Sequence, residues 1–285
     1  MIYDPKPTKY PLPDYTDGHY LEVEKKFDFI FDDKYPYVDT SKKFKRKQRW
    51  VRLGLRTMVF PFAPVKIGLR IKGRKIIKKH KELIKNGVIS VANHIHPWDY
   101  ISVMKAARPG KTNILVWNEN VNGPSGGLVR LVGGIPIPEH DFAATVAFKQ
   151  SVDNLLNNGG WLHVCPEGSM WEYYQPIRPF KHGAFYFARK LDKPIIPMAF
   201  SYRRPSWIRK HIFRQPAAVT LTIGEPLFVN KELDVNKQEE DLLIRCHDAV
   251  CLLAGIDPKD NIYEPVFHDS KRIDYYSDTY GSKNK

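Results

Sequence analysis

From Asn86 onward, short apolar runs alternate with stretches whose apolar residues recur at helical spacing. Runs of five to seven mostly apolar residues predict buried strands. They cover 88–92, 113–117, 161–165, 194–200 and 219–223, with a shorter run at 134–137 after a Gly-rich stretch that reads as a loop. Strands that alternate with helices imply a mostly parallel sheet covered by helices, so we predict one α/β domain.

The helices expected between these strands have recognisable starts. One begins near Pro97, because proline suits the first helical position. Another follows Asp141, a favourable N-cap residue, and continues to about Leu156. Two more are predicted over 183–190 and 238–253, where the second has an amphipathic pattern.

Charge divides the chain into three parts. The segment 42–85 holds 17 Lys and Arg residues and a single acid, Glu82, whereas residues 1–40 carry five Lys and nine acids without a regular hydrophobic period. We therefore expect an N-terminal arm (1–41), a basic amphipathic segment (42–85) and a catalytic domain (86–285).

A basic segment this concentrated attracts a polyanion. Six cations in Lys42–Arg49 lead into an apolar stretch that includes Trp50 and Phe60, with Arg52 and Arg56 on one helical face. This pattern is typical of a helix in the lipid headgroup plane, so the predicted partner is an anionic membrane surface. A core-packing helix with a charged outer face is the alternative. The chain has no zinc-finger, RNA-binding or basic-zipper pattern, so we expect no nucleic-acid partner.

Cysteine content and hydropathy favour a location inside the cell. Cys165, Cys246 and Cys251 are too few for a disulfide framework or a zinc site, and we expect reduced thiols. No stretch approaches the ~18 consecutive apolar residues of a membrane span. The N-terminus lacks the basic and apolar regions of a signal peptide. The expected location is cytoplasmic, peripheral on the inner face of the cell membrane.

The first candidate for chemistry is the segment 93–99, which directly follows the predicted strand 88–92. Reactive groups in open α/β sheets gather beyond the carboxyl ends of strands. From the first helical turn, Asp99 can reach back to one imidazole nitrogen of His94 and leave the other free as a base. We predict that His94 is a general base oriented by Asp99; an Asp99 that only caps the helix is the alternative.

A second candidate follows the predicted strand 161–165. Glu167 and Gly168 form a turn whose backbone N–H groups can hold an anion or an ester oxygen. A turn without a ligand is the alternative for Glu167. Further on, Arg178 and Lys181 stand beside the start of a predicted helix, where a phosphate is readily bound.

Taken together, these segments resemble the sequence blocks of the glycerolipid acyltransferase family, whose best-known members acylate lysophosphatidate. The blocks are N-H-x-x-x-x-D at 93–99, one shaped like G-x-I-F-I-D-R at 134–139, P-E-G-T-R at 166–170, F-K-x-G-A at 180–184 and a proline-containing strand at 195–197. They occur in family order, and the resemblance covers roughly residues 85–225.

The resemblance implies a glycerol-3-phosphate acyltransferase-like fold and an O-acyltransferase of phospholipid biosynthesis. Such an enzyme moves a fatty acyl group from acyl-CoA or acyl carrier protein to a hydroxyl of a lysophosphatidate- or lysophospholipid-like acceptor. His94 would deprotonate that hydroxyl, which would attack the thioester directly, without covalent intermediate, cofactor or metal. The implied substrate-binding residues are Asn93, Glu167, Gly168, Ser169, Arg178 and Lys181, with Asn93 positioning the His94 loop.

Two positions depart from the family pattern. Glu139 and Met170 stand where many members carry an Arg, and the second-block Arg grips the acceptor phosphate. This departure leaves open whether the acceptor is lysophosphatidate or a lysophospholipid with a larger head group. The alternative function is a catalytically inactive, membrane-peripheral scaffold that keeps the fold, against which the retained His94 and Asp99 argue.

Overall fold

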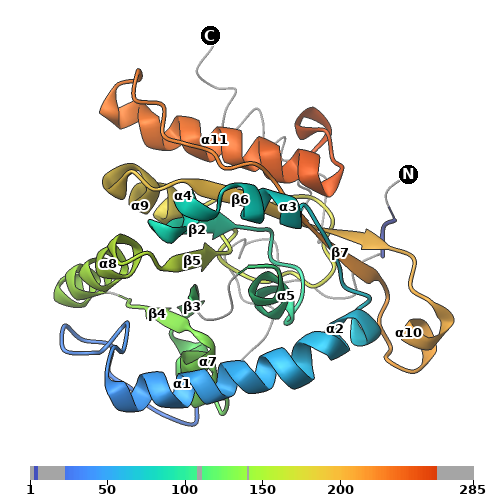
Figure 1. Ribbon diagram of the computed structural model, residues 1–285, viewed down its shortest axis with the longest axis horizontal. Coiled ribbons are helices and arrows are strands. Elements are labelled where there is room, and N and C mark those ends of the chain that lie inside the picture. The colour runs from blue at the N-terminus through green and yellow to red at the C-terminus, as the bar shows by residue number, and fades with distance from the viewer. Residues whose placement is uncertain (1–2, 6–22, 108–110, 140, 262–285) are drawn as a thin grey trace, which may run out of the picture.

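The computed structural model describes residues 3–5, 23–107, 111–139 and 141–261 of the chain (Figure 1). In this part of the chain, seven strands form one sheet in the order β1-β7-β6-β2-β5-β3-β4. The strands are β1 (Arg70–Lys72), β2 (Val88–Val91), β3 (Thr112–Trp117), β4 (Gly134–Ile137), β5 (Trp161–Val164), β6 (Ile195–Arg203) and β7 (Ala218–Ile223). The helices are α1 (Lys42–Gly54), α2 (Phe60–Lys66), α3 (Arg74–Lys79), α4 (Lys81–Lys85), α5 (Asp99–Ala106), α6 (Glu119–Asn122), α7 (Gly126–Val132), α8 (Phe142–Asn157), α9 (Gly183–Leu191), α10 (Trp207–His211) and α11 (Val235–Ala254).

The sheet is mostly parallel, as predicted. Neighbouring strands run parallel throughout except for β6 and β7, which pair antiparallel. All six apolar runs form strands, and Asp141 caps α8 by accepting a hydrogen bond from the backbone N–H of Ala144. We predicted a loop for the Gly-rich stretch before β4. The structure instead forms two short helices there, α6 and α7.

Helices cover both faces of the sheet, and successive residues of the central strands point to opposite faces. On one face, Ile89 and Ile195 pack in a core with residues of α8, α9 and α11. On the other, Val88 and Ile196 pack with residues of α2 and α5. Figure 1 shows α11 on one side of the sheet, and α1 and α2 along the other. Burial on both faces explains the continuous apolar runs of the sequence.

The basic amphipathic segment forms a long broken helix, in which a π-helical turn (Leu55–Val59) joins α1 to α2. The prediction that Arg52 belongs to a charged outer face is wrong. Arg52 is buried, and its Nη2 donates a hydrogen bond to the carbonyl oxygen of Thr112 at 2.7 Å. Phe60 is also buried, in a cluster with Tyr100 and Met104.

The outer side of this helix nevertheless exposes large apolar side chains. The exposed fraction is 70% for Trp50, 48% for Leu53, 76% for Met58, 42% for Phe62 and 51% for Val65. The segment therefore packs one side against the core and leaves an apolar stripe uncovered. Among the described residues, no helix combines the length and hydropathy that would cross a bilayer.

The described residues of the arm, the basic segment and the domain contact one another. Strand β1 lies inside the basic segment yet pairs with β7, so the sheet begins before residue 86. The described part of the arm packs on the domain, where the backbone N–H of Phe27 donates to the carbonyl of Asn122 and Tyr37 is fully buried against Phe148. Residues 1–2, 6–22 and 262–285 of the predicted arm and catalytic domain lie outside the described residues.

Candidate active site

The predicted site residues meet at the carboxyl ends of β2 and β5. These neighbouring strands are parallel and in register from Val88 opposite Trp161 to Val91 opposite Val164. Their following loops therefore emerge side by side at one edge of the sheet. His94 follows β2 and Glu167 follows β5, and the backbone N–H of His94 donates to Oε2 of Glu167 at 2.9 Å.

Asp99 holds the His94 loop in a fixed shape. One oxygen, Oδ2, lies 3.0 Å from Nδ1 of His94 and accepts hydrogen bonds from the backbone N–H groups of Ile95 (2.6 Å) and His96 (2.9 Å). The carboxylate stands in the first turn of α5, where the helix dipole favours a negative charge. Asp99 thus orients His94 and holds the loop before α5, whereas the N-cap position of this helix is Trp98, without a side-chain cap.

The tautomer of His94 follows from this contact. A carboxylate accepts hydrogen bonds, so Nδ1 carries the hydrogen that faces Asp99 and Nε2 is left for chemistry. The side chain of His94 is 27% exposed, against 3% for that of Asp99. Burial alone would lower the pKa of His94, but Cys165 and Asp99 together outweigh it and raise the pKa to about 10.

Cys165 is a site residue that sequence reasoning missed. Its thiol interacts with the His94 imidazole and lines the same cavity. Behind it, Sγ of Cys165 lies 3.8 Å from Nε2 of His163. The only sequence signal was its place directly after a strand, before the Pro-Glu-Gly turn.

A buried polar chain runs from β5 through β2 to this thiol. The hydroxyl of Ser90 accepts from Nε1 of Trp161 at 2.7 Å, so its own hydrogen is available to Nδ1 of His163 at 3.0 Å. Burial lowers the pKa of His163 to about 3, so the ring is neutral. With Nδ1 accepting, the hydrogen of His163 sits on Nε2 and points toward Cys165.

Three of the residues predicted to bind substrate, Asn93, Glu167 and Arg178, are buried and make hydrogen bonds within the protein. Asn93 clamps β6 by donating to the carbonyl of Phe200 at 3.1 Å and accepting from its N–H at 2.7 Å. Glu167 pairs with Arg178, whose Nη2 lies 3.1 Å from Oε2. The backbone N–H of Arg178 also donates to Oε1 of Glu167 at 2.9 Å, and its Nη1 donates to the Ser169 hydroxyl at 2.9 Å. A charge paired and buried in this way is satisfied by the protein itself. Asn93 and Glu167 thus hold the His94 loop in place, as expected of Asn93, and Arg178 supports Glu167.

A cavity of about 560 Å³ opens beside His94 at this edge of the sheet. Of the predicted substrate-binding residues, Gly168, Ser169 and Lys181 line it. Gly168 has a φ of +82°, a left-handed conformation that glycine adopts without strain, and the end of the Lys181 side chain lies close to it. The two departures from the family blocks, Glu139 and Met170, also lie in its wall.

Besides His94, the cavity wall carries one acid and one lysine. Glu139 accepts a hydrogen bond from Nε1 of Trp117 at 3.1 Å and is exposed, while Lys181 stands over Gly168. No group of three or more His, Cys, Asp or Glu side chains in the described parts of the chain is arranged to hold a metal ion. The groups available for chemistry here are therefore an oriented imidazole, a thiol, one cation and one carboxylate.

Comparisons with known proteins show what this part of the chain is similar to. The family model described as Acyltransferase matches residues 69–201, which contain both loops of the site. Among solved structures, the crystal structure of PlsC, the 1-acyl-sn-glycerophosphate (LPA) acyltransferase from Thermotoga maritima, is similar at 17% sequence identity. That match has a TM-score of 0.46 and covers 75% of this chain and 84% of that one. The comparison with curated proteins found no match.

Proposed function

Since residues 69–201 match the family model described as Acyltransferase, we propose that this protein transfers a fatty acyl group from a thioester to a lipid hydroxyl. The donor is acyl-CoA or acyl carrier protein, and the acceptor is a lysophosphatidate or a related lysophospholipid. The observation that carries the proposal is the contact between Oδ2 of Asp99 and Nδ1 of His94. This contact leaves Nε2 of His94 to take a proton from the acceptor.

In the proposed reaction, Nε2 of His94 takes the proton of the acceptor hydroxyl. The hydroxyl oxygen attacks the thioester carbonyl directly, the C–S bond breaks, and the proton passes to the departing thiolate. Asp99 stabilises the imidazolium that forms between these steps. No covalent acyl-enzyme is needed, because a thioester is already activated. Lys181 in the cavity wall holds the phosphate of the acceptor.

Glu139 bears on the choice of acceptor. A carboxylate in the cavity wall repels the phosphate of a small lysolipid but attracts an ammonium group. Within the proposed function, this favours an acceptor whose head group extends beyond the phosphate and carries a cation.

A direct test is to incubate the purified protein with radiolabelled acyl-CoA and a panel of lysolipids, and to measure free thiol release and labelled product. Transfer to at least one lysolipid supports the proposal. Thiol release and product at background level with every acceptor and with both donor types would contradict it and favour the inactive scaffold.

Cys165→Ala should shift the pH dependence of turnover. A general base acts in its neutral form, so turnover is expected to rise with pH as His94 loses its proton. Since Cys165 raises the pKa of His94, its removal lowers that pKa and moves the rising limb toward lower pH. Profiles of kcat against pH for both proteins test this. Superimposable profiles would show that the thiol does not act on His94; Cys246→Ala, at a buried thiol on α11, is the control.

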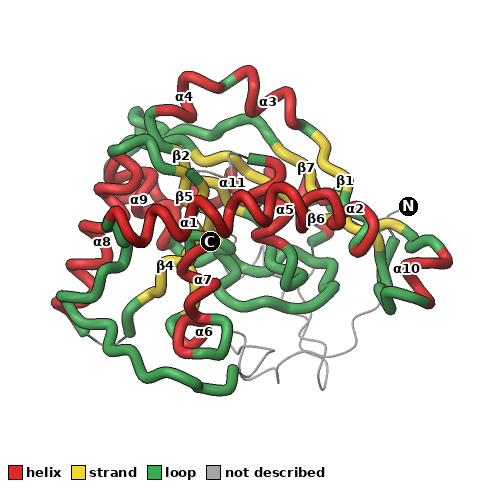
Figure 2. Tube along the Cα trace, turned by 60° about the horizontal axis from the view of Figure 1, so that its bottom comes forward, coloured by secondary structure: helices red, strands yellow, loops and turns green. Residues whose placement is uncertain are grey.

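We also propose that the outer side of α1 and α2 binds an anionic membrane, which places the enzyme at the inner face of the cell membrane beside its lipid acceptor. The exposed stripe from Trp50 to Val65 supports this, because large apolar side chains beside a basic run are typical of interfacial helices. Helix α10 extends the stripe: Phe213, just after it, contacts Phe62, and Trp207 is 69% exposed. Figure 2 shows α10 beyond the end of α2.

Replacing Lys42, Lys43, Arg46, Lys47 and Arg49 with Gln should release the protein from anionic vesicles at physiological salt. Each Lys or Arg near an anionic surface contributes roughly 1 kcal/mol, less after screening. Vesicle co-sedimentation measures the effect. High salt on the parent should imitate the variant only partly, because Trp50 and Met58 do not respond to ionic strength. Equal sedimentation of variant and parent would show that this charged face is merely solvated.

A further inference from the structure

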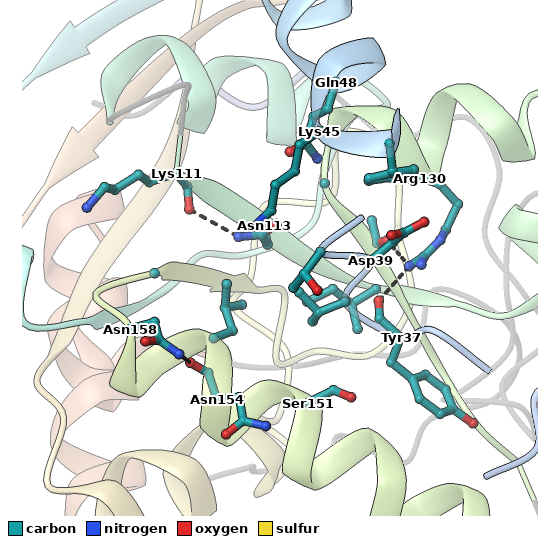
Figure 3. Close-up of a pocket in the computed structure, with 18 of the residues that line it drawn as sticks. Tyr37, Asp39, Lys45, Gln48, Lys111, Asn113, Arg130, Ser151, Asn154 and Asn158 are labelled. Atoms are coloured by element: carbon teal, nitrogen blue, oxygen red, sulfur yellow. Dashed lines mark hydrogen bonds between the residues drawn. The ribbon is translucent and has the colours of Figure 1, made fainter. Parts of the chain in front are cut away.

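A second cavity, of about 690 Å³, lies at the opposite end of the strands from His94 (Figure 3). Its floor is formed where β3, β4 and β5 begin, and its walls are residues 37–40 of the arm, α1 and α8. The six-residue strand β3 separates the two ends of the sheet by about 17 Å, at roughly 3.3 Å per step. This cavity is therefore distinct from the proposed active site.

Positive charge dominates its wall. Lys45, Arg52, Lys111 and Arg130 line the cavity, against one acid, Asp39. That carboxylate already accepts a hydrogen bond from the backbone N–H of Ser41 at 2.8 Å. An anion entering the cavity would meet an excess of positive charge.

The two guanidinium groups donate to backbone carbonyls, and Asp39 offsets part of the charge of Arg130. Arg52 donates to Thr112 as described above, and Arg130 donates to the carbonyl oxygens of Tyr37 (2.7 Å) and Gly134 (2.8 Å). Arg52 is only 8% exposed, and within the described residues its Nε has no hydrogen-bond partner. Burial lowers the pKa of both side chains, which shows that desolvation of their charge is not fully offset. A buried cation with an unpaired N–H is stabilised by an anion within reach.

The remaining wall is polar and suits a hydroxylated ligand. Figure 3 shows Lys45 reaching from α1 into the cavity toward Asn113 on β3, opposite the amides of Asn154 on α8 and of Asn158 just after it. Amide side chains supply both donors and acceptors for hydroxyl groups and phosphate oxygens. The volume is in the range of small-molecule sites, far larger than a bare phosphate ion requires.

We propose that this cavity binds an organic phosphate, whose phosphate group lies between Lys45 and Arg52 and whose hydroxylated body meets the asparagines of β3 and α8. The phosphate belongs either to a soluble metabolite or to the head group of a phospholipid. Because α1 supplies both cations, the ligand joins the proposed membrane-binding helix to the sheet. The site requires neither His94 nor the proposed acyl transfer.

Binding of glycerol 3-phosphate and of a short-chain, monomeric phosphatidate to the full-length protein, measured by calorimetry, tests the proposal. Lys45→Gln should weaken binding about tenfold or more, as expected for the loss of a charge-assisted contact to phosphate. Lys75→Gln removes the same charge from an exposed position of α3 outside the cavity and should leave the affinity unchanged. His94→Ala should also bind normally, because it alters only the other end of the sheet.

The two probes distinguish the source of the phosphate. A Lys45-dependent preference for phosphatidate would identify a lipid head group, and equal Lys45-dependent binding of both would identify a soluble organic phosphate. Absence of binding to the parent protein, or equal weakening by Lys45→Gln and Lys75→Gln, would overturn the proposal. So would loss of binding in His94→Ala, which would place the phosphate in the active-site cavity.

Discussion

His94→Ala is expected to lower turnover by about 10²–10⁴-fold, the loss typical of removing a general base. The substitution removes the imidazole that faces the cavity but keeps the backbone N–H that donates to Glu167. Release of free thiol from acyl-CoA in the presence of an active lysolipid acceptor measures the change. Retention of more than half the activity would rule out His94 as the base.

The same variant should fold as the parent does. Oδ2 of Asp99 keeps two of its three hydrogen bonds, from the backbone N–H groups of Ile95 and His96, so no buried carboxylate is stranded. The midpoint of thermal unfolding is therefore expected to change little. His182→Ala is the matched control, because His182 is exposed and pairs with Glu239 away from the cavity. Its turnover should equal that of the parent.

How far the sequence predicts this molecule depends on how local each interaction is. Strands β2, β5 and β6 are evident because both faces of each are buried, which gives an uninterrupted apolar run. Strand β1 has an exposed–intermediate–exposed pattern and a single apolar residue, Ile71. Only its pairing with β7 identifies it as a strand. No local pattern reveals an edge strand of that kind.

The same contrast applies to the site. The contact between His94 and Asp99 spans five residues of one loop, so spacing alone predicts it. The contact between Ser90 and His163 depends on the register of β2 against β5, across 73 residues of sequence. Cys165 acquires its neighbours only through that register. Sequence motifs therefore could not predict the polar chain that leads to Cys165.

Charged residues were the hardest to interpret, because a sequence does not show what a cation faces. Arg52 reads as one more charge on a basic helix, yet it is buried against a carbonyl 60 residues away. Arg178 reads as a phosphate ligand, yet it pairs with Glu167 from the adjoining loop. Burying a charge is costly, and the fold pairs Arg178 with Glu167, whereas Arg52 meets a carbonyl oxygen that its place in the sequence does not reveal.

Asp99→Asn is expected to reduce turnover by an amount on the order of 10²–10⁴-fold, with nearly unchanged affinity for the acyl donor. Asparagine has almost the same shape, and its amide oxygen can still accept from the N–H groups of Ile95 and His96. It carries no negative charge, so the imidazolium of His94 loses its stabilising partner. The pKa of His94 should fall as well, because Asp99 is one of the groups that raise it.

The control for Asp99→Asn is the same substitution at Asp141, which caps α8 through the N–H of Ala144 and has no contact with the cavity. Both variants lose a carboxylate at a helix start, so both should lower the unfolding midpoint by a similar small amount. Only Asp99→Asn should reduce kcat, because only Asp99 faces an imidazole that becomes charged during the reaction. Steady-state kinetics and thermal unfolding of the two proteins separate these effects. If Asp99→Asn lowers stability as Asp141→Asn does and leaves kcat intact, Asp99 is a helix cap alone and the His94–Asp99 mechanism is wrong.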